Sequence, residues 1–205
     1  MTNLPENPDP HLTDTRCAWC RTTPDMRQYH DTEWGFPVAA DRRLFESLCL
    51  ESFQAGLSWR TILAKRDHFR QAFADFDFDQ IAEFTAADVE RLLRDDGIVR
   101  HRGKIQAVIH NARCAQTLVT QYGSLGAFFW PFEPDETHLP PPQSVTTLPE
   151  AVALSKTLKA MGWQFLGPTT VFAFMQAVGL VNDHAADCPI RANVCKARQA
   201  FTKPK

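Results

Sequence analysis

The chain has 205 residues, of which 44% are hydrophobic and 22% are charged. We expect such a chain to bury one core, arranged as two lobes. No run approaches the ~18 consecutive apolar residues of a membrane span, so we expect no membrane association. The formal net charge of −2 excludes a polycation. Any contact with nucleic acid must therefore come from a local basic patch.

Residues 1–15 have neither an apolar run nor a basic start, which argues against a signal peptide. We expect them to be a disordered lead-in. Six cysteines without a targeting signal indicate a reduced, cytoplasmic protein, in which clustered Cys and His bind metal rather than form disulfides. Strand signals are almost absent and we find no internal repeat, so we predict an all-α fold.

The ordered region opens on candidate metal ligands. Cys17 and Cys20 form a Cys-x-x-Cys pair, and His30 follows after a loop. This arrangement is common for half of a zinc site. Spacing alone leaves open which of the two cysteines binds, and a surface histidine is the alternative for His30.

A single acid, Glu51, lies among apolar and small residues between Leu50 and Trp59. A buried carboxylate is costly unless something binds it, and a flat cationic or NH-bearing ligand stacked on Trp59 would do so. The pattern therefore indicates a pocket for a planar base. The alternative places Glu51 at a helix end and Trp59 in the core, and these ten residues alone favour that alternative.

The residues around Glu51 predict two helices joined at a corner. Asp41 can cap a helix with apolar residues at i, i+3 and i+4 that leads into Glu51, and Ser58 can start the next helix. Gly56 forms the tight corner between them. Leu57, at the corner, is a candidate for an exposed apolar wedge, with simple core packing as the alternative.

The middle of the chain alternates core helices with a basic turn. We expect the aromatic run between Phe69 and Phe84 to be core, and Thr85 to open a capping box. A long helix is predicted from Ile105 to Tyr122. The turn before it, Gly97 to Lys104, carries Arg102 and Lys104 and suggests a phosphate contact, although a solvated loop is at least as common.

The proline-rich stretch Pro131 to Pro149 should be an extended excursion. After one more helix, Phe165 to Thr170 predicts a hairpin. Gly167 permits close approach there, and the freed amides of Gly167, Thr169 and Thr170 at the helix start suit an anion such as a DNA phosphate. A plain helix start is the alternative.

The second half of the metal site lies near the C-terminus. His184 and Cys188 are four residues apart and would face one way on a helical turn. With Cys17 and His30 they complete a Cys2His2 set that joins the two chain ends. Because all four ligands are protein groups, we expect one structural zinc ion. Cys195 is a rival ligand, in a stretch (189–205) that we expect to be a mobile basic tail.

Several motifs, taken together and in order, resemble the 3-methyladenine DNA glycosylase I family. They are Arg16-Cys17-Ala18-Trp19, Tyr29 to Gly35, Leu50-Glu51, Gln54 to Trp59, Gly97 to Lys104, Gly167 to Thr170 and Val181 to His184. The resemblance covers roughly Arg16 to Cys188. We therefore expect a single glycosylase domain of two lobes over residues 16–188.

The resemblance implies a monomeric helix-hairpin-helix enzyme that excises 3-methyladenine from alkylated double-stranded DNA and releases the free base. It implies that Glu51 hydrogen-bonds the methylated base as the catalytic residue, with Tyr29 and Trp59 stacking on either side of it. It implies Cys17, His30, His184 and Cys188 as zinc ligands. The hairpin would grip the DNA backbone, and Leu57 would fill the vacated stack.

Several positions depart from the family pattern, among them Ser52, Phe53 and the single hairpin glycine, Gly167. Met26 and Phe172 stand where the family can carry tyrosines, which affects the expected lesion preference. Two other functions compete with the glycosylase. A non-catalytic, zinc-stapled DNA-binding module would explain the basic turn, hairpin and metal, but not the pocket. A metallohydrolase is disfavoured by the four protein ligands.

Overall fold

The computed structural model describes residues 14–205, and this range is helical without a strand, which confirms the all-α prediction. The expected lead-in falls almost entirely outside the described residues. Within residues 14–205 no helix has the length and apolar character needed to cross a membrane. The α-helices are α1 (Pro24–Thr32), α2 (Asp41–Gln54), α3 (Trp59–Ala64), α4 (Arg66–Ala72), α5 (Phe78–Ala82), α6 (Ala86–Arg94), α7 (Arg102–Tyr122), α8 (Leu125–Phe129), α9 (Pro149–Ala160), α10 (Pro168–Ala177) and α11 (Arg191–Ala200). Short 3-10 helices are η1 (Ala18–Thr22), η2 (Ala74–Phe76), η3 (Trp130–Phe132) and η4 (Glu136–His138).

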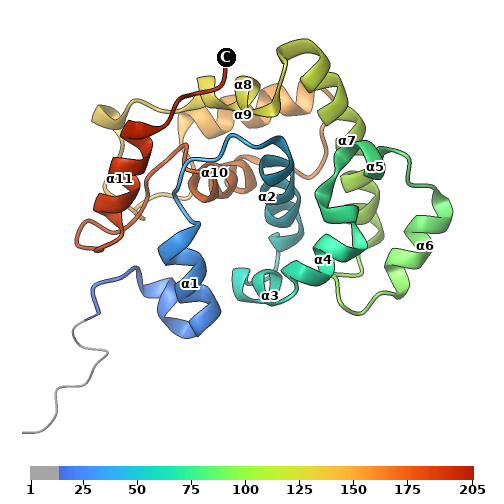
Figure 1. Cartoon of the computed structure of the whole chain (residues 1–205), viewed down its shortest axis with the longest axis horizontal. Coiled ribbons are helices and arrows are strands. Elements are labelled where there is room, and N and C mark those ends of the chain that lie inside the picture. Colours follow the sequence, from blue (N-terminus) through green and yellow to red (C-terminus); the bar gives the residue numbers. More distant parts are fainter. Residues whose placement is uncertain (1–13) are drawn as a thin grey trace, which may run out of the picture.

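Helix α2 runs through the centre of the molecule. In Figure 1 it lies between α1 and α11 at one end and α4, α5 and α6 at the other. It packs against α10, α7, α8 and α3. Its side chains are buried around most of the helix, including Leu44, Phe45, Leu48 and Phe53. Residues 44–53 of this helix are buried at nearly every position, so Glu51 is carried into the interior by its own helix.

The elements beyond α2 follow the predicted pattern. The aromatic run is core, because Phe69, Phe73 and Phe76 are fully buried. Thr85 forms the predicted capping box at the start of α6. Helix α7 ends at Gly123, whose φ of 82° is the left-handed conformation that favours glycine at this position.

The pair α9 and α10 packs closely and is joined by residues 161–167. Phe165, in this connection, has a φ of 58° and remains 47% exposed. A non-glycine residue in the left-handed region is uncommon and is held only where its surroundings require it. The connection is therefore a defined hairpin rather than a loose loop.

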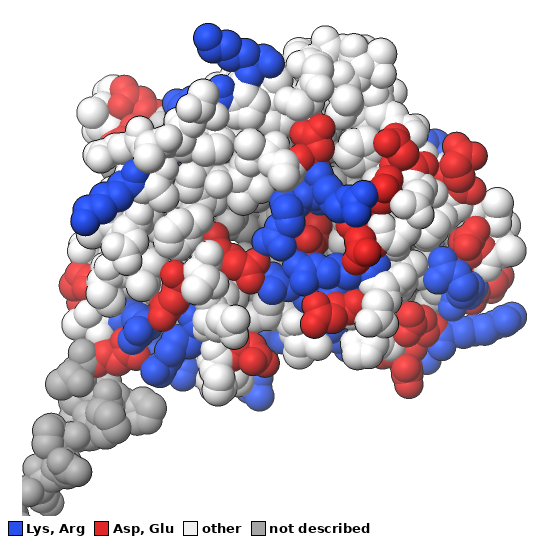
Figure 2. All heavy atoms as spheres, viewed as in Figure 1, with Lys and Arg blue, Asp and Glu red and all other residues white. Residues whose placement is uncertain are grey.

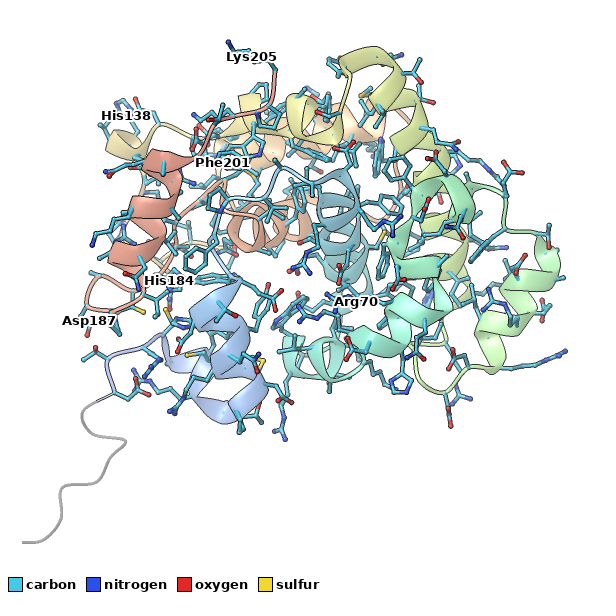
Figure 3. All side chains as sticks on the ribbon, viewed as in Figure 1. Arg70, His138, His184, Asp187, Phe201 and Lys205 are labelled. Carbon is cyan, nitrogen blue, oxygen red and sulfur yellow. The ribbon has the colours of Figure 1, made fainter. Side chains whose placement is uncertain are left out.

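Residues 189–205, which we expected to form a mobile tail, instead contain α11 and pack onto the body. Val194 is fully buried, and Phe201 packs against Trp130 with ring centroids 4.5 Å apart and planes tilted by 40°. Figure 3 shows the labelled Phe201 lying against the α8 region. Two of the basic residues that suggested a solvated tail hold it in place, because Arg198 and Lys203 both pair with Glu133.

Candidate functional site

Glu51 is buried in the last turns of α2, with 6% of its surface exposed. Within residues 14–205 its carboxylate makes no hydrogen bond and no ion pair. Burial raises its pKa to about 8, against an ordinary value of 4.5. Such a group is poised to accept a cation or an N–H donor, since a partner would repay the cost of burying its charge.

Tyr29 and Trp59 form one aromatic wall beside Glu51. Their ring centroids are 5.1 Å apart and their planes are tilted by 44°. A base stacked between two rings would require a gap of roughly 7 Å, because each stacked contact takes ~3.5 Å. The two rings leave no such gap, so the expectation that a base lies between them is corrected.

The wall, Glu51 and α10 line an open cavity of about 750 Å³. Gln143 and Gln176, which sequence reasoning missed, also line it. Both carboxamide groups are oriented by the Asp183 residue: Gln176 Nε2 donates to its carboxylate at 2.6 Å, and Gln143 Nε2 donates to its backbone oxygen at 3.2 Å. These polar groups come from distant segments, so no local spacing could have predicted them.

Of the two positions where the family can carry tyrosines, only one reaches this cavity. Met26 lines it, whereas Phe172 is buried in the core and does not. At this position the Met26 thioether lines the cavity, where the family can carry a second tyrosine. Trp19, from η1, supplies another aromatic surface.

A cluster of charges supports the aromatic wall from behind. Arg66 lies 5.9 Å from the centroid of the Tyr29 ring and donates two 2.8 Å hydrogen bonds to Glu33. Arg43 also binds Glu33. Figure 2 shows positive and negative side chains intermingled at the centre of the face in view. Arg70, labelled in the same region of Figure 3, pairs with Glu46. The charges are paired, so this face presents no continuous positive surface.

Four potential metal ligands from both ends of the chain meet in one buried cluster. The ligand atoms of Cys17, His30, His184 and Cys188 all lie within 4.8 Å of one another. Cys188 Sγ is 3.5 Å from His30 Nε2 and 3.6 Å from His184 Nδ1, and Cys17 Sγ is 3.8 Å from His184 Nδ1. These separations suit a tetrahedral ion with bonds of ~2.0–2.3 Å.

The outer partners of the two histidines set which ring nitrogens face the centre. His30 Nδ1 is 2.7 Å from an Asp31 oxygen, and His184 Nε2 is 3.0 Å from the Trp34 carbonyl oxygen. Each outer nitrogen therefore carries the proton, which leaves lone pairs on the inner nitrogens. Burial lowers the pKa of His30, and that of His184 to about 4, which keeps both rings neutral. Figure 3 shows the labelled His184 between α1 and the chain leading into α11.

The rival cysteines lie outside this cluster. Cys20 donates its thiol hydrogen to the Cys17 carbonyl, and Cys195 Sγ accepts a hydrogen bond from Asn182. Gln143 Nε2 donates to Cys17 Sγ at 2.9 Å. The geometry therefore resolves the choice that spacing left open in favour of Cys17.

The corner between α2 and α3 is a type II β-turn. Ala55 has φ −51° and ψ 113°, Gly56 has φ 86°, and Leu57 N donates to Gln54 O. Ser58 caps α3 as predicted, accepting a hydrogen bond from Thr61 N. Leu57 is 43% exposed at the tip. It is therefore not core, and the wedge interpretation is the one that its position allows.

The predicted basic turn overlaps the first turn of α7, where Arg102 is exposed and Lys104 is buried. Arg102 is about half exposed and pairs with Glu90 at 2.7 Å. Lys104 is buried, and its ammonium donates to the carbonyl oxygens of Phe53 and Ala55. Its expected contact with a DNA phosphate is therefore corrected, because the buried ammonium is bound to these two carbonyl oxygens.

The hairpin residues proposed to contact an anion lie at the start of α10. Gly167 is its N-cap and is exposed, with open space where a Cβ would lie. Thr169 is exposed and Thr170 is partly buried in the first turn. Backbone amides at such a position are available to an anion.

The chain is similar to known proteins over most of its length. Residues 19–192 match the family described as methyladenine glycosylase. The DNA-3-methyladenine glycosylase 1 of Escherichia coli is 46% identical over 180 residues, covering 84% of this chain and 95% of the relative. The DNA-3-methyladenine glycosylase of Haemophilus influenzae is 42% identical over 183 residues, covering 87% and 99%. A crystal structure of a 3-methyladenine DNA glycosylase I variant in complex with 3-methyladenine is 39% identical, with a TM-score of 0.80, and the match covers 85% of this chain and 96% of that one.

Proposed function

Because this chain belongs to the methyladenine glycosylase family, we propose that it hydrolyses the N-glycosidic bond of 3-methyladenine in alkylated double-stranded DNA and releases the free base. The curated relatives carry the name of that enzyme, which favours catalysis over a non-catalytic DNA-binding module. The observation that carries the proposal is the unpaired, buried Glu51 facing a cavity with an aromatic wall.

The chemistry of the lesion complements this cavity. Methylation at N3 places a positive charge on adenine, which weakens the glycosidic bond and makes the base a good leaving group. Stacking the cationic ring on the Tyr29 and Trp59 wall contributes about 1–2 kcal/mol when the site is desolvated. Glu51 adds a charge-assisted hydrogen bond to a ring N–H. Unmodified adenine lacks the charge and gains neither interaction fully.

Because Glu51 is buried, its charge depends on whether the cationic base occupies the cavity. In the free protein its raised pKa favours the neutral acid at pH 7. A cation in contact restores the carboxylate, because an opposite charge lowers the pKa of an acid. The pocket thus holds its negative charge chiefly when the charged base is present.

In the reaction, water adds to the sugar C1′ and the bond from C1′ to the base nitrogen breaks. The electron pair of that bond passes to the purine and neutralises its positive charge, and the proton of the water leaves to solvent. The base must first leave the duplex, which costs a few kcal/mol and costs less for a damaged pair. Leu57 fills the vacated stack in this proposal, and no lysine forms a covalent intermediate.

We assign α9, residues 161–167 and α10 as the helix-hairpin-helix element. The amides at the start of α10, from Gly167, Thr169 and Thr170, would bind a backbone phosphate. Arg102 would add a contact at its exposed position, after exchange from Glu90. The residues that carry this function fall within 16–188, which we treat as one glycosylase domain.

We assign the Cys17, His30, His184 and Cys188 cluster to one structural zinc ion. Thiolate and imidazole ligands are the set that zinc prefers, and four protein ligands leave no open position for chemistry. When bound, zinc would supply a cross-link between the start of the domain and its C-terminal end. It would thereby fix Trp19 and Tyr29, which lie in the same N-terminal segment as two of the ligands.

The test is a base-release assay on methylated duplex DNA that separates 3-methyladenine, 3-methylguanine and 7-methylguanine. The proposal predicts that free 3-methyladenine is the main product and that it appears without strand cleavage. Release of no methylated base by folded, zinc-loaded protein would contradict it.

A further inference from the structure

The first turn of α7 lies between the two elements to which the proposed function assigns DNA contacts. On one side, His101 meets Phe165 of the hairpin, with ring centroids 6.2 Å apart. On the other side, the ammonium of Lys104 lies 2.7 Å from the carbonyl oxygen of Ala55, in the turn that presents Leu57. This short segment therefore couples the hairpin to the wedge.

Lys104 is committed to the end of α2. Its Nζ donates to Phe53 O at 2.9 Å as well as to Ala55 O. Carbonyls in the last turn of a helix have no partner within the helix and carry the negative end of its dipole. A buried ammonium satisfies them, and burial with only these partners lowers the pKa of Lys104 below its ordinary value.

The turn itself has little else to hold it. Ala55, Gly56, Leu57 and Ser58 are all exposed. A Cβ built on Gly56 would meet nothing within 4 Å. An exposed type II turn with a glycine at its third position can change orientation at low cost. The hydrogen bond from Lys104 to Ala55 O is thus the contact that ties the turn to the interior.

We propose that Lys104 is a positioning residue, which holds the Gln54–Leu57 turn so that Leu57 enters the base stack as the damaged nucleotide leaves it. The inference rests on the proposed glycosylase function. Lys104 touches neither DNA nor base in this account. It acts through the turn, so its effect should depend on whether a base has to be drawn out of a duplex.

The experiment compares Lys104→Met with the parent protein in single-turnover release of 3-methyladenine. The same methylated DNA is used as a duplex and as denatured single strands prepared without heating, because heat alone would break the weakened glycosidic bond. Lys65→Met is the matched control, because Lys65 Nζ also donates to a backbone carbonyl, that of Asp96 at 2.7 Å, which does not belong to the turn. A Leu57→Ala variant and the Lys104→Met, Leu57→Ala double variant complete the set.

Lys104→Met is expected to slow release from the duplex roughly tenfold, because displacement of a positioned group by even ~1 Å has large effects on rate. Release from denatured DNA should change less than about twofold, since no paired stack needs a wedge. The double variant should be no slower than Leu57→Ala alone, as expected for two residues acting in one step. Lys65→Met should match the parent on both substrates.

Three results would overturn the inference while leaving the enzyme's function intact: equal losses on duplex and denatured DNA, a fully additive double variant, or no loss on the duplex. If Lys104→Met fails to fold, the Leu57→Ala variant provides the test, because it changes only an exposed side chain and should fold. An unchanged ratio of duplex to denatured rates for Leu57→Ala would contradict the wedge and therefore Lys104's role. A parent protein that releases no 3-methyladenine from either form would instead contradict the proposed function.

Discussion

His30 and His184, 154 residues apart in the chain, bring Nε2 and Nδ1 within 3.0 Å of each other. Both outer nitrogens of these rings have acceptors, so two lone pairs face one another at the centre of the cluster. Facing lone pairs repel unless a cation lies between them. This contact is the strongest structural argument for a metal ion at the junction of the chain ends.

We predict that the purified protein contains about one zinc ion per chain. Cys188→Ser should lose most of the zinc and unfold at a lower temperature, because metal binding contributes directly to folding. Metal analysis and calorimetry measure the two effects. Cys114→Ser is the control, since Cys114 lies outside the cluster. A Cys188→Ser protein with full zinc and unchanged stability would place the ion elsewhere.

The burial of Glu51 predicts a pH-dependent cost in stability. Its folded pKa of about 8 lies above its ordinary value of 4.5, so the native state binds more protons than the unfolded chain between these values. The contribution of Glu51 to the free energy of unfolding is fully present below pH 4.5 and is lost as the pH rises through about 8. Glu51→Gln removes this titration.

The difference in thermal midpoint between Glu51→Gln and the parent should therefore shift in favour of the variant as pH rises from 5 to 9. Thermal unfolding monitored by circular dichroism at each pH provides the measurement. Glu83→Gln, at an exposed position, should show no such trend. A difference that is independent of pH would mean that Glu51 ionises in the folded protein much as it does in the unfolded chain.

The aromatic wall predicts a specific loss on truncation of Trp59. Trp59→Ala should weaken binding of free 3-methyladenine roughly tenfold, since stacking and cation–π contacts contribute about 1–2 kcal/mol. Trp59→Phe retains a ring and should lose much less. Isothermal titration compares the two variants. Equal affinities for Trp59→Ala and the parent would remove Trp59 from the base-binding surface.

Gly56 gives a prediction about the turn. A residue with a side chain is strained at its φ of 86°, although the space around it is open. Gly56→Ala should therefore destabilise the protein by only about 1 kcal/mol. Its release of 3-methyladenine from a duplex should fall more than its release from denatured DNA. Denaturant unfolding and the base-release assay test the two statements, and an equal loss on both DNA forms would contradict the second.

Local sequence signals predicted the elements whose cause is local. The helix ending at Gly123 and the capping box at Thr85 follow from spacing and residue type, and both are present. The two pairs of ligands indicated the metal cluster, but His184 and Cys188 lie on a non-helical turn, closed by Cys188 N donating to Ala185 O, and not on the predicted helical turn. Asp41 shows the limit, because its carboxylate accepts from Leu125 N and Gly126 N instead of capping its own helix.

What the sequence could not reveal depends on partners far along the chain. From the sequence alone Lys104 is expected to be an exposed cation, but α2 places two carbonyl oxygens beside it. The basic C-terminal residues are expected to form a mobile tail, but they pair with Glu133. Gln143 and Gln176 enter the cavity from segments without a motif. The contact between Tyr29 and Trp59 likewise depends on how α1 and α3 pack. Residue types alone therefore suggested, wrongly, that the two rings lie on opposite sides of the base.

The most direct test of the account is single-turnover release of 3-methyladenine from methylated duplex DNA by the parent and by Glu51→Gln, with zinc content and circular dichroism shown to be equal. Loss of a hydrogen bond to a charged partner predicts a fall of roughly 10- to 100-fold. Excision by Glu51→Gln at the parent's rate would remove Glu51 from the chemistry and contradict the account.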